Sequence, residues 1–250
     1  MLCEGSCNVL KLNIPYFYGR MNIVLTGGSR GIGYETALAL ASDAGNRIMV
    51  IARNAEAMQA LQQRALHSNI ETVVCDIADG DMGVVQQRLN EWGTVDVLIN
   101  NAGVLKNAAF TETGVDVWEL TMRVNIFGTV RIIQLVLPYM TDSTVAHIVN
   151  IGSMGGVQGT SKFPGLSAYS ASKAALANLT ECLAEELKDK GIKVNCLALG
   201  AVNTEMLREA FPGYTAPVGP GEMGRFIAEF ATKNHRFMNG KIIPVSVSTP

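Results

Sequence analysis

The chain has little charge and few cysteines, histidines and aromatic residues for its length. Charged side chains make up 17% of its 250 residues, the formal net charge is −2, and Lys and Arg are scattered along the chain. That pattern argues against a nucleic-acid-binding surface. The five dispersed cysteines are too few for a disulfide framework. His67, His147 and His235 form no cluster, and Cys3 and Cys7 have no second pair of metal-ligand spacing. We therefore expect neither a nucleic-acid partner nor a metal.

Long apolar runs are also missing. No run approaches the roughly 18 residues of a membrane span, so we expect no membrane partner. Residues 1–20 lack the basic start and apolar stretch of a secretory signal. They fit no element of the fold, whereas Met21 leads directly into a strand-like run. We interpret residues 1–20 as a leader or flexible arm, or as an artefact, and residues 21–250 as a single domain. A cytoplasmic location follows only by default.

What the sequence does have is a regular alternation of apolar, β-branched runs with amphipathic stretches. The strand-like runs are 22–27, 47–52, 71–75, 95–100, 145–151, 192–198 and 241–247, and examples of the amphipathic stretches are 31–43, 81–92, 114–139 and 167–190. Near-continuous apolar runs are typical of strands buried on both faces. The sequence therefore predicts an α/β fold of the doubly wound, Rossmann type: a mostly parallel seven-stranded sheet with helices on both faces.

The first strand-to-helix junction is rich in glycine. It reads Thr26-Gly-Gly-Ser-Arg-Gly-Ile-Gly33. Glycines there allow a sharp turn, let the backbone approach a pyrophosphate and let the helix pack close to the strand, and the helix N-terminus favours an anion. A tight turn without any ligand needs glycines too. The position between the first strand and the first helix favours a nucleotide site.

Four more motifs follow in order. They are Asn100-Asn-Ala-Gly103 after the fourth strand, Asn125 in the next helix, Asn150-Ile-Gly-Ser153 at the end of the fifth strand, and Tyr169-Ser-Ala-Ser-Lys173. Together with the glycine loop, this ordered set resembles the short-chain dehydrogenase/reductase family over residues 22 to about 247. The resemblance implies an oxidoreductase that binds a nicotinamide dinucleotide.

Tyr169 and Lys173 are the expected proton-handling pair. They are four residues apart in an apparent helix and therefore share a face. A nearby ammonium lowers the pKa of a phenol, so Lys173 would prepare Tyr169 as general acid or base. The resemblance further implies that Ser153 binds the substrate oxygen, that Asn125 holds a proton-relaying water, and that Lys173 also holds the nicotinamide ribose. Alternatively, Tyr169 and Lys173 are an ordinary pair on one helix face, with the tyrosine packed and the lysine solvated. For Asn125, the alternative is a polar residue that its helix tolerates.

The predicted cofactor is NADP(H). The second strand ends at Arg53 without the acidic residue that would bind the free ribose hydroxyl of NAD. A guanidinium offers positive charge and several donors to a 2′-phosphate, and Arg30 could approach from the other side. Asp76 is expected at the adenine, and Asn101 is expected to brace the sheet. Alternatively, Arg53 and Arg30 are solvated surface residues with no role in cofactor binding. The predicted cofactor-binding set is Gly27, Ser29, Arg30, Gly31, Ile32, Gly33, Arg53, Asp76, Ile77, Asn101, Ala102, Gly103, Tyr169, Lys173, Gly200, Val202 and Thr204.

The sequence departs from the family pattern in one motif and leaves two segments open. Leu199 replaces the proline of P-G-x-V-x-T, although Gly200, Val202 and Thr204 are present. Residues 204–240 are interpreted as either a mobile substrate lid or an inert connection. In the loop from 153 to 169, Met154, Phe163 and Leu166 form either an apolar substrate wall or ordinary packing.

The predicted function is hydride transfer between NADP(H) and a carbonyl or alcohol substrate. A catalytically silent dinucleotide-binding regulatory protein of the same fold is the alternative, and an epimerase or dehydratase would need a larger substrate domain. We also expect a homodimer or homotetramer. The stretches 114–139 and 167–190 carry more apolar residues than one sheet face covers: Ile132, Ile133, Leu176, Leu179 and Leu183.

Overall fold

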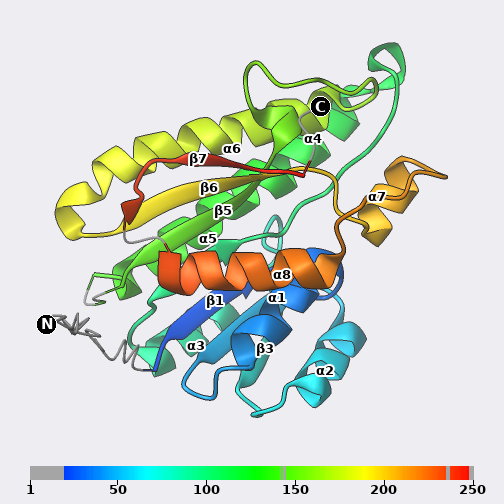
Figure 1. Ribbon diagram of the computed structural model, residues 1–250. Coiled ribbons are helices and arrows are strands. Elements are labelled where there is room, and N and C mark those ends of the chain that lie inside the picture. The colour runs from blue at the N-terminus through cyan, green and yellow to red at the C-terminus, as the bar shows by residue number, and fades with distance from the viewer. Residues whose placement is uncertain (1–19, 142, 144, 235–236, 248–250) are drawn as a thin grey trace, which may run out of the picture.

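The computed structural model describes residues 20–141, 143, 145–234 and 237–247. Its centre is a seven-stranded, entirely parallel sheet with the strand order β3-β2-β1-β4-β5-β6-β7 (Figure 1). The strands are β1 (Asn22–Thr26), β2 (Arg47–Ala52), β3 (Ile70–Val74), β4 (Val97–Asn100), β5 (His147–Ser153), β6 (Lys193–Leu199) and β7 (Ile242–Val245). This confirms the predicted doubly wound fold. Residues 1–19, with Cys3 and Cys7, and His235 lie outside the described residues.

Helices connect the strands. The α-helices are α1 (Gly31–Ala41), α2 (Ala55–Arg64), α3 (Gly83–Trp92), α4 (Val115–Met122), α5 (Thr129–Val136), α6 (Ser167–Glu186), α7 (Glu205–Ala210) and α8 (Pro220–Glu229). Shorter helical segments are η1 (Phe110–Glu112), η2 (Arg123–Gly128), η3 (Leu137–Tyr139), η4 (Met154–Gly156), η5 (Lys188–Lys190) and η6 (Phe230–Asn234). The sequence analysis assigned no element to 55–64, where Asn54 caps α2 through its side chain.

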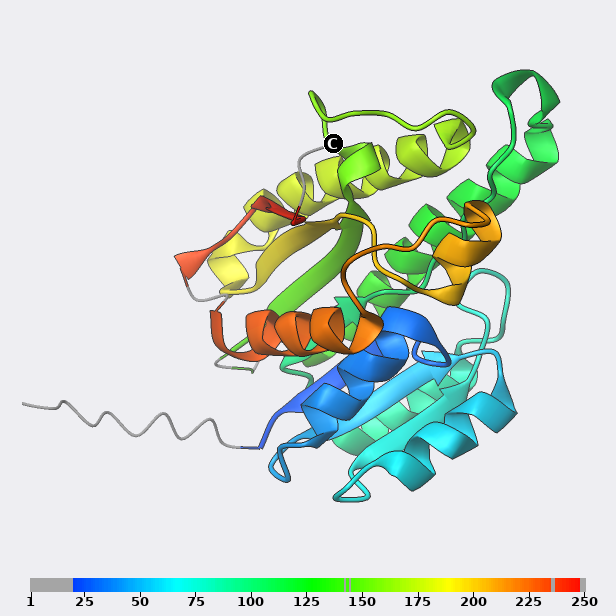
Figure 2. The ribbon, with the colours of Figure 1, turned by 45° about the vertical axis from the view of Figure 1, so that its right-hand side comes forward.

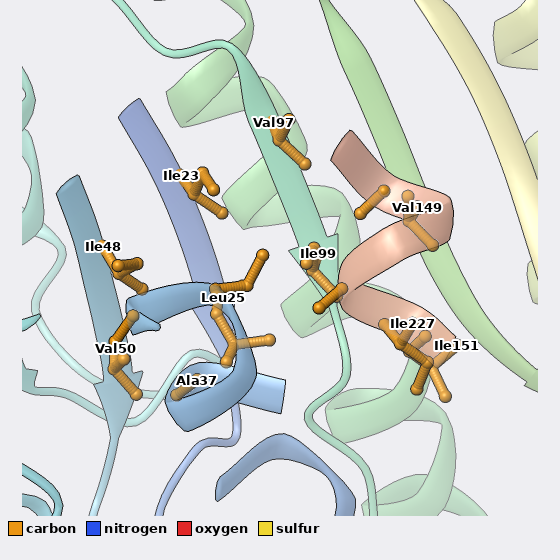
Figure 3. Close-up of a cluster of buried hydrophobic side chains, with 14 of the residues drawn as sticks. Ile23, Leu25, Ala37, Ile48, Val50, Val97, Ile99, Val149, Ile151 and Ile227 are labelled. Carbon is orange, nitrogen blue, oxygen red and sulfur yellow. The ribbon is translucent and has the colours of Figure 1, made fainter. Parts of the chain in front are cut away.

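The helices cover the sheet as two layers. On one face α1, α2 and α8 bury apolar side chains against the strands, as Figure 3 shows for Ala37 of α1 and Ile227 of α8. On the other face α3, α5 and α6 do the same, for example through Leu89 and Ile132. Strand residues such as Ile23 and Val24 alternate between these two clusters. The near-continuous apolar strands of the sequence are explained by this double burial.

The predicted helix 114–139 is interrupted rather than uniform. It runs as α4, a π-helical segment η2, α5 and the 3-10 turn η3, which contains Pro138. By length and composition alone, Val115–Tyr139 could cross a membrane, with a mean hydropathy of 1.4, which the sequence analysis overlooked. In the structure Ile132, Ile133 and Val136 are buried against the sheet. A core helix of this kind passes the same compositional test.

One premise of the predicted oligomer is wrong. Ile132, Ile133 and Leu176 are not surplus apolar residues, because the core of the single chain buries each to 3% exposure or less. The exposed apolar residues of the 114–139 stretch are instead Val115 and Phe127, with exposures of 73% and 59%.

The strand order reverses between β1 and β4. β1 pairs with β2 on one side and with β4 on the other, so the segments that follow β1 and β4 diverge at the carboxyl edge of the sheet. A doubly wound sheet binds ligands at this point. The glycine loop and Asn100-Asn-Ala-Gly103, which the sequence places after β1 and β4, meet here.

Candidate active site

The glycine loop after β1 is fixed by close packing and by backbone conformation. A Cβ atom at Gly27 would lie 2.6 Å from Ala102 Cα, and one at Gly33 would lie 2.3 Å from the Gly27 oxygen. Gly27 and Gly31 have φ angles of +74° and +59°, which side chains other than glycine adopt only with strain. Asn101 Nδ2 donates to the carbonyl oxygens of Thr26 (3.1 Å) and Gly27 (2.9 Å). Asn101 thus braces the loop, as expected from the sequence.

The loop leaves the start of α1 available to a ligand. Arg30 is the N-cap residue of α1, and its side chain makes no capping hydrogen bond. The first backbone N–H groups of a helix have no partner within the helix and attract anions. A Cβ atom at Gly31 would approach only the Thr204 side chain, at 3.5 Å. The loops after β1 and β6 therefore come together at Gly31 and Thr204.

The departure at Leu199 leaves the strand intact. Leu199 is the last residue of β6, pairs with Val245 of β7 and is buried in the core. Gly200 N–H then donates to the Val245 oxygen (2.8 Å), and Thr204 caps α7 by accepting from Leu207 N–H (3.3 Å). Thr204 therefore lies beside the glycine loop without the proline.

The two arginines predicted to bind the 2′-phosphate are both exposed and both paired with carboxylates. Arg53, directly after β2, lies 3.4 Å from Asp76, which follows β3. Arg30 lies 3.2 Å from both Glu205 and Glu209 of α7. Arg53 and Asp76 are thus adjacent at the carboxyl edge, as expected for residues that share the adenosine end of a dinucleotide. The glutamate partners of Arg30 were not anticipated.

Tyr169, Lys173 and Ser153 converge at the carboxyl end of β5. Ser153 is the last residue of that strand, and its hydroxyl lies near enough to Tyr169 to act on the pKa of the phenol. Lys173 lies one turn beyond Tyr169 on α6, with Nζ 5.7 Å from the centre of the tyrosine ring. The buried Lys173 Nζ donates to the Ile151 carbonyl oxygen (2.8 Å). The predicted serine, tyrosine and lysine therefore form one cluster.

The electrostatics of the pair differ from the expectation. Burial lowers the pKa of Lys173 from 10.5 to about 8. Burial also raises the pKa of Tyr169, and the Ser153 hydroxyl opposes this rise only in part. The Lys173 ammonium lies over the tyrosine ring and donates to the Ile151 carbonyl oxygen. Tyr169 therefore keeps its proton at neutral pH, as a general acid must.

Asn125 is buried in the π-helical segment η2 and clamps the loop after β4. Its Oδ1 accepts from Val104 N–H (2.8 Å), and its Nδ2 donates to the Val104 oxygen (3.1 Å) and to Ser172 Oγ (2.9 Å). Ser172 in turn donates to the Tyr169 carbonyl (2.7 Å). Asn125 and Lys173 lie close together, because a Cβ atom at Gly103 would be 3.3 Å from Asn125 Oδ1 and 3.6 Å from Lys173 Nζ. Single π-helical turns often occur at functional sites.

A buried polar chain beneath the site was missed by the sequence analysis. Asn100 Nδ2 donates to Asn150 Oδ1 (2.8 Å), and Asn150 Nδ2 donates to Thr180 Oγ1 (2.9 Å). Thr180 lies seven residues after Lys173 on α6, so both side chains project toward the sheet. This chain ties β4, β5 and α6 together directly below the catalytic residues. The helical spacing of Thr180 from Lys173 was the only available signal.

A cavity lies between Phe110 and the segment 162–170, and Ser153, Tyr169 and Lys173 are not part of its lining. It has a volume of about 380 Å³, and its lining includes Phe110, Phe163 and Leu166. Met154 is buried and lies outside this lining. Of the three residues considered for a substrate wall, Phe163 and Leu166 thus face a cavity and Met154 packs internally.

The 204–240 segment divides into two parts. At the carboxyl edge, the α7 region contacts loops after β4 and β5, through Asn107 Nδ2 to the Ala210 oxygen (2.7 Å) and through an edge contact between Phe211 and Phe163 (Figure 2). By contrast, α8 packs against α1, where a Cβ atom at Gly224 would lie 2.7 Å from the α1 backbone. Of the two parts, the α7 region lies at the carboxyl edge of the sheet, where a substrate lid would have to lie.

The fold and this site define an oxidoreductase of the doubly wound, dinucleotide-binding class. The model of the family described as short chain dehydrogenase matches residues 21–215. The chain therefore belongs to the short-chain dehydrogenase/reductase family, whose members use a nicotinamide cofactor.

Individual relatives of known sequence or structure are similar to this chain over nearly its whole length. It is 33% identical to the rhamnolipids biosynthesis 3-oxoacyl-(acyl-carrier-protein) reductase of Pseudomonas aeruginosa, over 92% of this chain and 97% of the relative. It is 30% identical to the 3-oxoacyl-(acyl-carrier-protein) reductase FabG of Thermotoga maritima, over 89% and 94%. A solved dehydrogenase/reductase from Sinorhizobium meliloti 1021 superposes with a TM-score of 0.78 at 28% identity, over 91% of this chain and 94% of that chain.

Proposed function

We propose that this chain transfers hydride between NADP(H) and a carbonyl or alcohol substrate, with Tyr169 as the proton donor in reduction. The observation that carries the proposal is the convergence of Tyr169, Ser153 and Lys173 at the carboxyl edge, opposite the glycine loop. The residues fit a dinucleotide: the start of α1 has no side-chain cap, and Gly103 brings the backbone after β4 close to Asn125 and Lys173. A bound nicotinamide supplies or accepts the hydride.

The protein groups around the reacting carbonyl each have one task. Tyr169 holds a proton on its hydroxyl at neutral pH, because burial raises its pKa, and donates it to the substrate oxygen. Ser153 donates a hydrogen bond to the same oxygen as negative charge grows there. Asn125 and Ser172 orient the start of α6 through the Tyr169 carbonyl. Lys173, whose Nζ lies over the tyrosine ring, would hold the nicotinamide ribose.

Arg53 and Arg30 support the choice of NADP(H) over NAD(H). Both guanidiniums are exposed, and no acidic side chain ends β2, where the residue at the tip is Ala52 followed by Arg53. A 2′-phosphate would replace carboxylates as their partner and form stronger bidentate contacts. Asp76 then remains free to face the adenine.

Steady-state kinetics of the purified full chain test the proposal. We expect NADPH-dependent reduction of at least one member of a carbonyl panel that begins with 3-oxoacyl thioesters, because two relatives are named as 3-oxoacyl-(acyl-carrier-protein) reductases. The cavity lined by Phe110, Phe163 and Leu166, together with Lys162, Ser167 and Ser170, offers an acyl chain apolar surface close in sequence to Tyr169. Tight NADPH binding without turnover of any carbonyl would favour the silent regulatory protein instead.

We also propose that the chain forms a homodimer or homotetramer. Val115 and Phe127, which are exposed on the α4–η2 run, support this proposal. Ile132 and Ile133 no longer do, because they are buried in the core of the single chain. Light scattering at micromolar concentration should give a multiple of the 26.8 kDa chain mass. Phe127→Asp should lower that mass, and a monomeric wild-type chain would refute the proposal.

A further inference from the structure

An arginine with no role in the sequence analysis joins α5 to the loop after β3. Arg131 Nη1 donates to the carbonyl oxygens of Ile77 (2.9 Å) and Ala78, and Nη2 donates to the Gly80 oxygen (2.8 Å). The guanidinium is partly buried, and within the described part of the chain no carboxylate pairs with it. Its donors therefore serve the loop alone.

The loop that Arg131 holds is otherwise a small closed turn. Asp76 Oδ1 accepts from Ala78 N–H (2.9 Å), and the Asp76 carbonyl accepts from Gly80 N–H (2.8 Å). These two bonds fix the shape of the turn, but they do not fix its position against the rest of the protein. Contacts with the helical run η2–α5 place the turn: the Arg131 bonds, and an ion pair of Arg123 with Asp79 (3.5 Å).

A second contact sets the distance between helix and loop. Gly128, the last residue of η2, packs directly on Ile77, because a Cβ atom at Gly128 would lie 2.9 Å from Ile77 Cγ1. Asn125 lies three residues earlier in η2 and clamps the loop after β4. One helical run therefore positions both the loop after β3 and the loop after β4.

We propose that Arg131 is a positioning residue for the adenine half of the cofactor site. By binding three carbonyl oxygens it holds Asp76 and Ile77 where the adenosine end of the dinucleotide contacts them. The proposal rests on the cofactor site given above. Charged hydrogen bonds of this kind are about twice as strong as neutral ones, and a lysine ammonium lacks the fork that spans three acceptors.

Calorimetric titration of the full chain with ADP-ribose tests this inference without requiring turnover. We expect Arg131→Ala to weaken ADP-ribose binding tenfold or more, and Arg131→Lys to weaken it less. With NADPH the KM should rise in parallel while kcat at saturating cofactor stays within twofold. Gln134→Ala, on the exposed face of α5, is the matched control and should bind like the wild type.

A second variant separates positioning from simple loss of stability. Gly128→Ala retains Arg131 but pushes on Ile77, and we expect it also to weaken ADP-ribose binding. Unchanged ADP-ribose affinity in folded Arg131→Ala would overturn the inference, as would a kcat loss as large as the affinity loss. A wild-type chain that binds ADP-ribose but reduces no carbonyl would count against the proposed function alone.

Discussion

The two halves of the site hold their charged groups by opposite means. In the catalytic half, Lys173 is buried, bonded to a backbone carbonyl and underlain by the Asn100–Asn150–Thr180 chain. In the adenosine half, the side chains of Arg53 and Arg30 are more than half exposed and form ion pairs with carboxylates. Exposed ion pairs contribute little to stability and rearrange easily. Under the proposed function, proton transfer would depend on a rigid, desolvated group, whereas cofactor choice would depend on groups that can exchange partners.

The largest effect is expected in the rigid half. Tyr169→Phe removes only the hydroxyl that carries the proton, and general acid–base catalysis contributes about 10²–10⁴-fold to rate. We expect kcat to fall by that range while NADPH affinity, measured by titration, stays within twofold. A variant that retained most of its kcat would remove Tyr169 from the mechanism and with it the contrast between the halves.

A pH profile should show the titration of Lys173. Its pKa is lowered to about 8, so the ammonium is lost as the pH rises through that value. The pKa of Tyr169 is raised, so the tyrosine keeps its proton over the same range. We expect kcat/KM for reduction to fall above about pH 8, since this ratio reports groups of the free enzyme.

Lys173→Met is the control for the expected fall of kcat/KM above about pH 8. It should lower kcat and weaken cofactor binding together, because two roles are assigned to the lysine, and its residual activity should no longer fall near pH 8. If the wild-type profile were flat from pH 6 to 10, the charge of Lys173 would have no part in the reaction.

The next effect is expected in the exposed half. Arg53→Asp replaces the cation that we propose for the 2′-phosphate, and a hydrogen bond to a charged group is worth about 1.5–3 kcal/mol, or roughly 10–100-fold in kcat/KM. We expect NADPH to lose that factor and the preference to be erased or reversed. Arg64→Asp, on the exposed face of α2, is the matched control. Equal kcat/KM with NADH and NADPH in the wild type would show that neither arginine recognises the phosphate.

The smallest effect is expected outside both halves. Deletion of residues 1–20 should leave activity and melting temperature unchanged, provided Met21 remains. Met21 is buried, and its carbonyl oxygen accepts a hydrogen bond from Arg47 N–H (2.7 Å) at the start of β2. Aggregation or lost activity in the truncated chain, measured beside the full chain, would show that the leader has a role.

The sequence by itself determined the sheet, the glycine loop and the placement of the proton-transfer cluster. Strands buried on both faces are apolar throughout, and a turn with positive φ angles requires glycine, so Gly27 and Gly31 are evident from local pattern. Tyr169 and Lys173 meet because a spacing of four residues puts both on one helix face. Such features depend on residues close together in the chain.

Only the tertiary structure decided what surrounds those residues. Burial, which a local pattern does not measure, raises the pKa of Tyr169, whereas the sequence predicted a lower pKa next to a lysine. The contacts of Arg30 with α7 join residues 175 and 179 positions apart, and Arg131 binds a loop more than 50 positions earlier. No spacing rule predicts these contacts, because they depend on how separate βα units pack together. The same packing made Ile132 and Ile133 core residues rather than an interface.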